Sequence, residues 1–304
     1  MSDLKIRDSF HPYAMITIIF WSLAYVLTRL TLQYFTAFSL GFLRYFAASC
    51  SLAFIAILFK MKPPRKNDFL WFLSAGTFGF FFYMITFNKG METVTASTSS
   101  VIIATVPIIT ALIARFIYKE KLNNIQWIAI VIEFIGVIAL TLINGVFSIN
   151  TGLFWLLLAA LALSIYNLLQ RKLTKTYTAL QTSAFSIFFG TIMLTIFLPV
   201  SIDEAMHAPS IQLFYIAILG IFSSAIAYVA WSQAFAKAKQ TSLVSNYMFI
   251  TPFLTSILGF LIANEIPDFA TLIGGGIIIF GVLVFNFSEK INGRLNHKNV
   301  NLKN

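Results

Sequence analysis

The sequence has 304 residues, of which 59% are hydrophobic and 11% are charged, and its formal net charge is +10 at pH 7. Soluble domains carry about 25% charged residues, so this composition excludes an ordinary soluble protein. The basic residues stand in short loops between apolar runs and form no nucleic-acid motif, so nucleic acid is not an expected partner. Cys50 is the only cysteine, which excludes a disulfide framework and a cysteine-based metal site.

Apolar stretches fill almost the whole chain, and a helix needs roughly 20 apolar residues to cross a membrane. Outer-membrane strands would instead alternate apolar and polar residues. A cleaved signal peptide would end in a cleavage site of small residues, and the first apolar stretch has none. We therefore interpret this stretch as a retained helix, with a cleaved signal peptide as the alternative. In chain order, the expected transmembrane helices cover residues 12–32, 36–59, 69–88, 94–118, 124–144, 151–171, 178–200, 210–235, 240–263 and 268–288.

The loops test this count independently. With ten helices and a cytoplasmic N-terminus, eighteen basic residues fall on the cytoplasmic side, only Arg29 and Lys89 fall outside, and Arg44 lies within a span. Cytoplasmic loops of membrane proteins carry an excess of Lys and Arg. The charge pattern therefore predicts a multi-pass protein in the lipid bilayer of the cytoplasmic membrane, with both termini in the cytoplasm. The eighteen are Lys5, Arg7, Lys60, Lys62, Arg65, Lys66, Arg115, Lys119, Lys121, Arg171, Lys172, Lys175, Lys237, Lys239, Lys290, Arg294, Lys298 and Lys303.

The two halves of the chain are related. When the first half of the sequence is shifted by 145 residues, it aligns without a gap with identical residues of the second half. The aligned pairs are Tyr83 with Tyr228, Ser97 with Ser242, Ser100 with Ser245, Pro107 with Pro252, Thr110 with Thr255, Glu120 with Glu265, Gly136 with Gly281 and Val137 with Val282. The predicted repeats are residues 1–146 and residues 147–304, the second with a short basic tail. Because each holds five helices, the second must be inverted, an arrangement typical of secondary transporters with a binding site near the midplane. The alternative is chance matching between apolar segments.

The matched segments resemble the drug/metabolite transporter superfamily, specifically its EamA-type branch of ten-helix transporters. The residues that carry the resemblance are Trp21, Ser22, Arg44, the stretch 96–122 with Pro107 and Glu120-Lys121-Leu122, Gly136, Val137, Ser242, Pro252, Glu265, Gly281 and Val282. The resemblance covers nearly the whole chain. The second half departs from the pattern, because it has Glu265-Ile266-Pro267 where the first has Glu120-Lys121-Leu122.

The resemblance implies an all-α fold of ten transmembrane helices with alternating access to a central cavity. Helices one, three, four, six, eight and nine would line the cavity, and helices five and ten would lie outside it. Substrates of the family include amino acids and their metabolites, nucleoside-like compounds and vitamins. The predicted function is efflux of a small metabolite, an amino acid or related compound. Import or exchange of a nucleoside-like or vitamin-like metabolite is the alternative.

Polar and aromatic residues recur at i, i+4 and i+7 on the expected cavity helices, which places them on one face of each helix. Such a lining suits a small-molecule pocket. The candidate substrate-binding residues are Trp21, Tyr25, Tyr83, Asn167, Tyr228, Trp231 and Asn246. Hydroxyl residues of the same stripes have a simpler use in helix packing. For Asn167 and Asn246, an interhelical hydrogen bond explains the amide as well as a ligand does.

Two ionisable residues and two prolines lie within the expected spans. Arg44 either reaches the outer headgroups or faces the cavity, and the sequence favours neither. Glu133 lies on a helix expected to be peripheral, so we predict a pairing or an oligomer contact, which makes a homodimer one conceivable assembly. Pro107 and Pro252 are predicted to kink their helices, either as pivots or as static bends.

A membrane-embedded enzyme is the competing class of function. The chain has no H-E-x-x-H or G-x-S-x-G motif and no clustered Asp, and its three histidines, His11, His207 and His297, stand far apart outside the spans. We therefore expect no catalytic residues, no metal and no cofactor. A structural or receptor-like role is a third class, which the inverted repeat disfavours. No acidic residue in the cavity helices identifies a proton carrier, so uniport and proton antiport both stay open.

Overall fold

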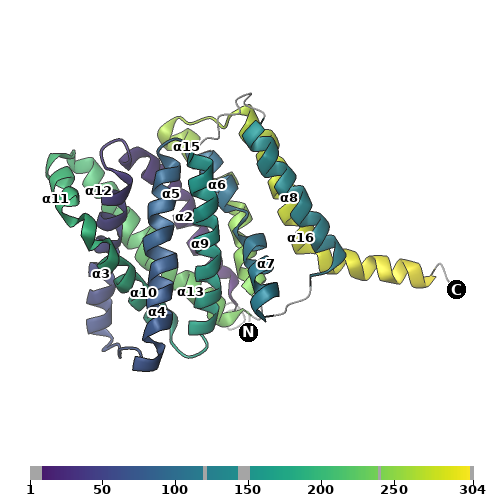
Figure 1. The fold of residues 1–304 in the computed structure, drawn as a ribbon, viewed down its shortest axis with the longest axis horizontal. Helices are drawn as coiled ribbons and strands as arrows, with labels where there is room; N and C mark the ends of the chain where they lie inside the picture. Colours follow the sequence, from purple (N-terminus) through teal and green to yellow (C-terminus); the bar gives the residue numbers. More distant parts are fainter. Residues whose placement is uncertain (1–8, 119–121, 143–150, 239–240, 302–304) are drawn as a thin grey trace.

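The computed structural model describes residues 9–118, 122–142, 151–238 and 241–301, and these ranges contain helices and no strand (Figure 1). Short 3-10 and π-helical stretches, marked η, interrupt or precede several α-helices. In chain order the elements are α2 (His11–Thr31), α3 (Ala37–Leu58), η1 (Lys66–Asp68), α4 (Phe69–Gly76), η2 (Thr77–Phe82), α5 (Tyr83–Met91), α6 (Ala96–Ile103), α7 (Val106–Tyr118), α8 (Asn124–Leu142), α9 (Thr151–Leu173), α10 (Ala179–Leu194), η3 (Thr195–Phe197), α11 (Leu198–His207), α12 (Ser210–Ile218), η4 (Leu219–Ile226), α13 (Ala227–Lys237), α14 (Thr241–Ser245), η5 (Asn246–Ile250), α15 (Thr251–Ala263) and α16 (Phe269–Asn301).

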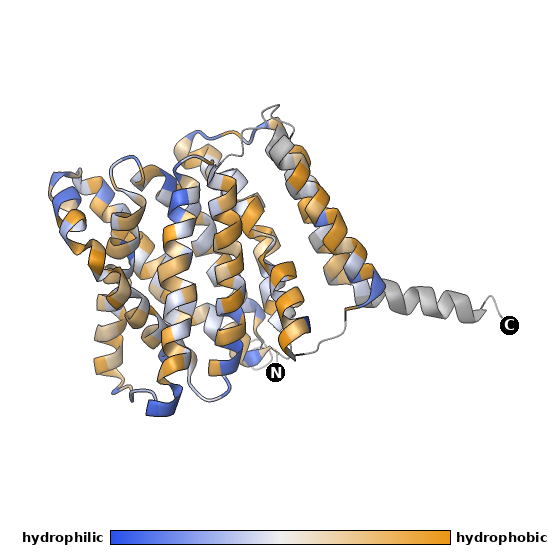
Figure 2. Ribbon diagram, viewed as in Figure 1, coloured by the Kyte–Doolittle hydropathy of each residue, from blue (hydrophilic) through white to orange (hydrophobic). Residues whose placement is uncertain are grey.

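Within these ranges, seven helical segments are long and apolar enough to cross a membrane. They are His11–Thr31, Ala37–Leu58, Lys66–Met91, Ala96–Ile117, Thr151–Leu173, Ala179–His207 and Ser210–Lys237. At the other three expected spans the apolar helices are shorter: Asn124–Gly136, Tyr247–Ala263 and Thr271–Phe285. Apolar residues run along the helices and polar residues gather at their ends, as Figure 2 shows.

The distribution of side chains is that of a protein surrounded by lipid. Large apolar side chains face outward; Ile57 is 77% exposed and Phe116 is 78% exposed. Small hydroxyl side chains lie inside, and Ser100, Thr17 and Ser183 are fully buried. In a bilayer the outward apolar surface is solvated by acyl chains, while small inward residues let helices approach closely and share hydrogen bonds.

Threonine caps start two helices at matching places. The Oγ1 atom of Thr36 accepts the backbone N–H of Ser39 at 3.3 Å at the start of α3. Thr178 does the same for Gln181 at 3.2 Å at the start of α10, and the Gln181 side chain accepts the Thr178 N–H at 3.1 Å. The first N–H groups of a helix have no partner within it. These caps therefore fix where α3 and α10 begin.

Two membrane-spanning segments contain a π-helical stretch. The first, η2, joins α4 to α5, and the second, η4, joins α12 to α13. A π-helix bonds residue i to residue i+5, so it is wider than an α-helix, and short π-helical stretches inside α-helices are frequent at functional sites. Both stretches end immediately before the helical turn that carries a tyrosine of the candidate site.

The two prolines mark breaks between helices where the sequence suggested kinks within them. α6 ends at Ile103 and α7 begins at Val106, which makes Pro107 the second residue of α7. The 3-10 stretch η5 precedes α15, in which Pro252 is again the second residue. A proline in the first turn of a helix loses no intrahelical hydrogen bond, because that N–H has no partner there. Each proline thus begins a new helix.

Helix α2 lies at the centre of the bundle and packs against α13, α15, η4 and α6. Helix α9 packs in turn against α5, α7, α6 and η2, while α3 packs against η4 and α10. Helices α8 and α16 run side by side at one flank (Figure 1), and α16 meets the main bundle through α6, η5 and α7. Helices expected to be peripheral therefore stand apart from the main bundle.

Glycines set the close approach of α8 and α16. A Cβ atom on Gly136 would lie 2.7 Å from Cγ1 of Ile278, and one on Gly281 would lie 2.6 Å from Cγ of Glu133. Both distances are too short for a side chain to fit without movement. Glu133 is buried in this contact, and its carboxyl oxygens have no hydrogen-bond partner among the described residues. An intrahelical or interhelical ion pair, one of the roles predicted for Glu133, is therefore not seen in the described part of the chain.

Candidate functional site

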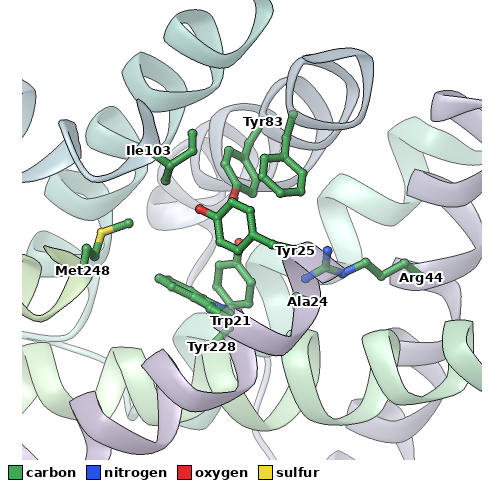
Figure 3. Close-up of a pocket in the computed structure, with 9 residues that line it drawn as sticks. Trp21, Ala24, Tyr25, Arg44, Tyr83, Ile103, Tyr228 and Met248 are labelled. Atoms are coloured by element: carbon green, nitrogen blue, oxygen red, sulfur yellow. The ribbon is translucent and has the colours of Figure 1, made fainter. Parts of the chain in front are cut away.

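Aromatic rings from three helices enclose a small cavity in the bundle. Trp21 and Tyr25 come from α2, Tyr83 comes from α5 and Tyr228 comes from α13 (Figure 3). All four were chosen from the sequence, and the structure brings them together. The complete lining is Trp21, Ala24, Tyr25, Arg44, Tyr83, Phe87, Ile103, Tyr228 and Met248.

Local sequence explains how these rings converge. Trp21 and Tyr25 are four residues apart, which places both on one face of α2. Tyr83 is the first residue after the π-helical stretch η2, and Tyr228 is the second residue after η4. The wider turn of a π-helix shifts the residues beyond it around the helix axis. The two interrupted helices therefore present their tyrosines to the same cavity.

The rings pack tightly against one another. The Trp21 ring centroid lies 5.1 Å from that of Tyr228, and the Tyr83 ring is stacked on Phe87 at 5.4 Å. Tyr25 contacts Phe87 edge-on at 5.2 Å. Separations of 4.5–7 Å with tilted or offset geometry are favourable for aromatic pairs. The lining is thus a preformed apolar surface with phenol and indole groups among it.

The cavity between the rings is closed. Its volume is about 10 Å³, which is room for about one water molecule. The four rings are each 8% exposed or less, so solvent has little access to them. Pockets that hold small molecules measure about 300–1,000 Å³. The cavity, as the structure has it, is therefore too small to hold a metabolite.

Trp231 and Asn167, also chosen from the sequence, lie behind the cavity wall. The Trp231 ring packs on Trp21 with centroids 5.0 Å apart, and its Nε1–H donates to Oδ1 of Asn167 at 3.1 Å. Both residues are fully buried, and neither lines the cavity. The sequence left two roles open for Asn167, a hydrogen bond between helices and a contact with ligand, and this direct contact favours the first. The side chain of Asn246, the seventh candidate, lies outside the described residues.

Arg44 is a lining residue that the sequence left undecided. It is 3% exposed, and its Nε–H donates to Oγ of Ser224 on η4 at 2.7 Å. Figure 3 shows its guanidinium directed toward the aromatic rings. Its Cζ atom also lies 5.8 Å from the centroid of the neighbouring Tyr45 ring, within range of a cation–π contact. Arg44 therefore faces the cavity, one of the two directions that the sequence left open.

Four other lining residues, Ala24, Phe87, Ile103 and Met248, were not selected from the sequence. Phe87 stands four residues after Tyr83, so the same helical spacing signals it. Ala24, Ile103 and Met248 are apolar residues among many others, and no feature of the sequence separates them from lipid-facing side chains.

One end of the bundle is tied by an ion pair. Nε of Arg29, near the end of α2, lies 3.4 Å from Oε1 of Glu265, beyond the end of α15. Arg29 also donates to the carbonyl oxygens of Met91 and Glu92 at 2.8 and 3.0 Å. Glu265 in turn accepts the N–H of Ala96, the first residue of α6, at 3.0 Å. These contacts join α2, α5, α6 and the α15–α16 connection above the cavity.

Comparison with known proteins identifies the family. The sequence profile of the EamA-like transporter family matches residues 10–142 and 150–287. The chain belongs to this family. It is 32% identical over 265 residues to an uncharacterized transporter, YdfC, of Bacillus subtilis (strain 168), and the match covers 86% of each chain. The EamA-type resemblance within the drug/metabolite transporter superfamily is thereby confirmed, and the protein is a multi-pass membrane protein of a family of small-molecule transporters.

Two other EamA-like relatives have more specific names. The chain is 26% identical over 272 residues to a probable terminal-alkyne amino-acid exporter of Streptantibioticus cattleyicolor, covering 90% of this chain and 91% of that one. It is 26% identical over 257 residues to an S-adenosylmethionine uptake transporter of Rickettsia prowazekii (strain Madrid E), covering 84% of each. The names of these relatives point to transport and not to catalysis.

The EamA-like chain also shares its fold with a solved structure. One crystal structure superposes with a TM-score of 0.64 over 91% of this chain and 96% of its own, at 15% sequence identity. At that identity the likeness concerns the course of the backbone alone.

Proposed function

We propose that this chain is a secondary transporter that moves a small metabolite across the cytoplasmic membrane by alternating access. The observation that carries the proposal is the closed aromatic cavity. Tyr83 and Arg44 come from the first half of the chain and Tyr228 and Met248 from the second, so the cavity lies between the halves. Secondary transporters built from repeats bind substrate at such a junction.

We infer ten transmembrane helices in two inverted halves, residues 1–146 and 147–304. The two successive matches of one family profile support this. So do the helix contacts, which come in crossed pairs: α2 meets α13 as α5 meets α9, and α3 meets η4 as α10 meets η2. In each pair the partners exchange halves, as a two-fold relation between the repeats requires, and five helices in each half would make the second repeat inverted. The loop charges support placing both termini in the cytoplasm.

Alternating access requires that the cavity open to each side in turn. The ion pair between Arg29 and Glu265 closes one end, and the loop charges assign that end to the outside. Side-chain exposures of 32% and 17% leave this pair in contact with solvent. A partly exposed pair is worth at most about 1 kcal/mol, so it can break during each transport cycle.

For the substrate, we propose an amino acid or a related compound, moved outward. The relative named as a terminal-alkyne amino-acid exporter supports this choice. The relative named as an S-adenosylmethionine uptake transporter supports the alternative, import or exchange of a nucleoside-like metabolite. The aromatic lining suits either class, because rings stack on apolar side chains and on nucleobases alike.

The test is a metabolite profile of cells and medium. Cells overexpressing the chain are compared with cells expressing an unrelated membrane protein at equal membrane abundance. An exporter should enrich its substrate in the medium, whereas an importer should deplete it there and enrich it in the cell. The compound that changes is then offered to proteoliposomes of purified protein. If no compound changes in either direction and none enters proteoliposomes, the chain is not a metabolite transporter.

A further inference from the structure

The cavity contains a buried positive charge without a counter-ion. Arg44 is 3% exposed, and no carboxylate of the described residues lies within ion-pair distance of it. Its contacts there are the hydrogen bond from Nε to Ser224 and the face of the Tyr45 ring. A guanidinium has five N–H donors and stays protonated in proteins. The remaining N–H groups of Arg44 thus have no protein acceptor in the described part of the chain.

An arrangement of this kind is costly in the empty protein. Burial of a charge is unfavourable unless it is paired and hydrogen-bonded, and an ionisable residue within a membrane-spanning helix marks a functional site by default. We propose that the counter-ion is the substrate, and that Arg44 binds a carboxylate group of the transported metabolite. This proposal rests on the transport function proposed above and specifies its substrate class.

The single positive charge of Arg44 favours a carboxylate over a phosphate. A planar guanidinium forms bidentate pairs with both groups. A single arginine balances one negative charge, whereas a phosphate group carries more. Since Arg44 is buried among protein side chains, the headgroup of a membrane lipid does not reach it in this state.

Ser224 holds the guanidinium in place for this task. Its Oγ atom accepts from Nε at 2.7 Å, which leaves the two terminal nitrogens of Arg44 free to turn toward the cavity. The rings of Trp21, Tyr25 and Tyr228 then surround the rest of the ligand. The expected substrate is therefore a molecule with a carboxylate at one end and an apolar or aromatic body.

The experiment compares acids with their amides. Full-length protein in detergent is titrated with the standard amino acids and benzoate, each paired with its carboxamide, and binding is followed by tryptophan fluorescence and thermal stabilisation. For at least one pair, the acid should bind roughly 10- to 100-fold more tightly than the amide. R44Q should bring that ratio close to one, and R44K should keep part of it. R65Q, a change at an exposed loop arginine, should leave the ratio unchanged.

Other variants and probes cover the remaining outcomes. If R44Q does not fold, R44K and S224A replace it, and both should lower the acid-to-amide ratio several-fold. An unchanged ratio in folded Arg44 variants, no acid that binds the wild type, or equal competition by chloride alone would overturn the proposal.

Uptake into proteoliposomes distinguishes the proposal of transport from the proposal that Arg44 binds a carboxylate. An acid that binds but is not moved would contradict transport only, and a moved compound without a carboxylate would contradict the Arg44 subsite only.

Discussion

Arg29 and Glu265, which are far apart in the sequence, meet with Nε and Oε1 3.4 Å apart and so join the end of α2 to the connection after α15. Each partner also binds backbone groups of other helices, Arg29 at the end of α5 and beyond it, and Glu265 at the start of α6. The pair is thus the centre of a small network that joins four elements of the bundle at one end.

The first prediction is that E265Q opens this end more often. The neutral amide loses the ion pair, and because both side chains are partly exposed we expect a shift of at most about 1 kcal/mol, roughly fivefold in the population of the open state. A cysteine at Thr28, buried one residue before Arg29, should then react faster with a membrane-impermeant maleimide in a C50S background. K89Q breaks the nearby Lys89–Glu92 pair and is the matched control. The cysteine at position 28 is compared in three proteins: without a further change, with E265Q and with K89Q. Equal reaction rates in all three would contradict a closing role for the Arg29–Glu265 pair.

The second prediction concerns Pro107 and Pro252. Alanine at either position restores a backbone N–H and lets a helix continue across the break that precedes the proline. If these breaks act as pivots, P107A and P252A should slow transport more than they lower the amount of folded protein. The measurement is the initial rate of uptake into proteoliposomes, divided by the amount of reconstituted protein. Unchanged rates in both variants would leave the prolines as static bends.

A third prediction separates packing from binding at Asn167. N167A leaves the buried Trp231 indole N–H without an acceptor, which should cost about 1–3 kcal/mol of folded-state stability. W231F removes the donor of the same hydrogen bond, whereas N167A removes its acceptor. The double variant should therefore lose less than the sum of the two single losses, as measured by unfolding in detergent. Additive losses would show that the two residues act independently, and the role of Asn167 would then have to be sought in the ligand.

The fourth prediction tests the packing of the π-helical stretch η2. A methyl group at Gly79 would overlap the ring of Tyr166 on α9, so G79A should destabilise the protein by about 1–3 kcal/mol. Gly276 has no atom within 4 Å of the corresponding position, which makes G276A the matched control. That variant should be neutral or slightly stabilising because alanine favours helix. Thermal unfolding in detergent measures both, and equal midpoints would mean that η2 and α9 are not in close contact.

The fifth prediction concerns topology. Reporter fusions after Lys66 and after Leu173 should indicate the cytoplasm, and a fusion after Asn150 should indicate the outside, because of the eighteen-to-two distribution of loop charges. A cytoplasmic signal after Asn150 would exclude ten helices with this orientation.

Sequence patterns located the aromatic part of the candidate site because ring residues at i, i+4 spacing must share a helix face. Trp21 and Tyr25 follow from that rule, and the repeat selects Tyr83 and Tyr228 as equivalent residues. The same patterns do not distinguish a residue at the cavity surface from one directly behind it. Trp231 has the spacing of a lining residue, yet it packs behind Trp21 and bonds Asn167.

Two further features depend on tertiary structure. The direction of the Arg44 side chain is set by Ser224 on another helix, so a sequence cannot decide between cavity and headgroup. The π-helical stretch η2 contains Thr, Phe and Gly, and η4 contains Leu, Gly, Ile, Phe, Ser and Ala, all of which also occur in regular transmembrane α-helices. Their hydrogen-bond register is therefore a consequence of packing against α9, α10 and α3, which local propensity does not reveal.

The size of the closed cavity has an electrical consequence for the cell. A space of about 10 Å³ between buried rings holds no continuous column of water, and ions do not cross a bilayer where water is absent. A membrane that contains many copies of the unloaded protein in this state should therefore retain its resistance to ion flow and its proton gradient.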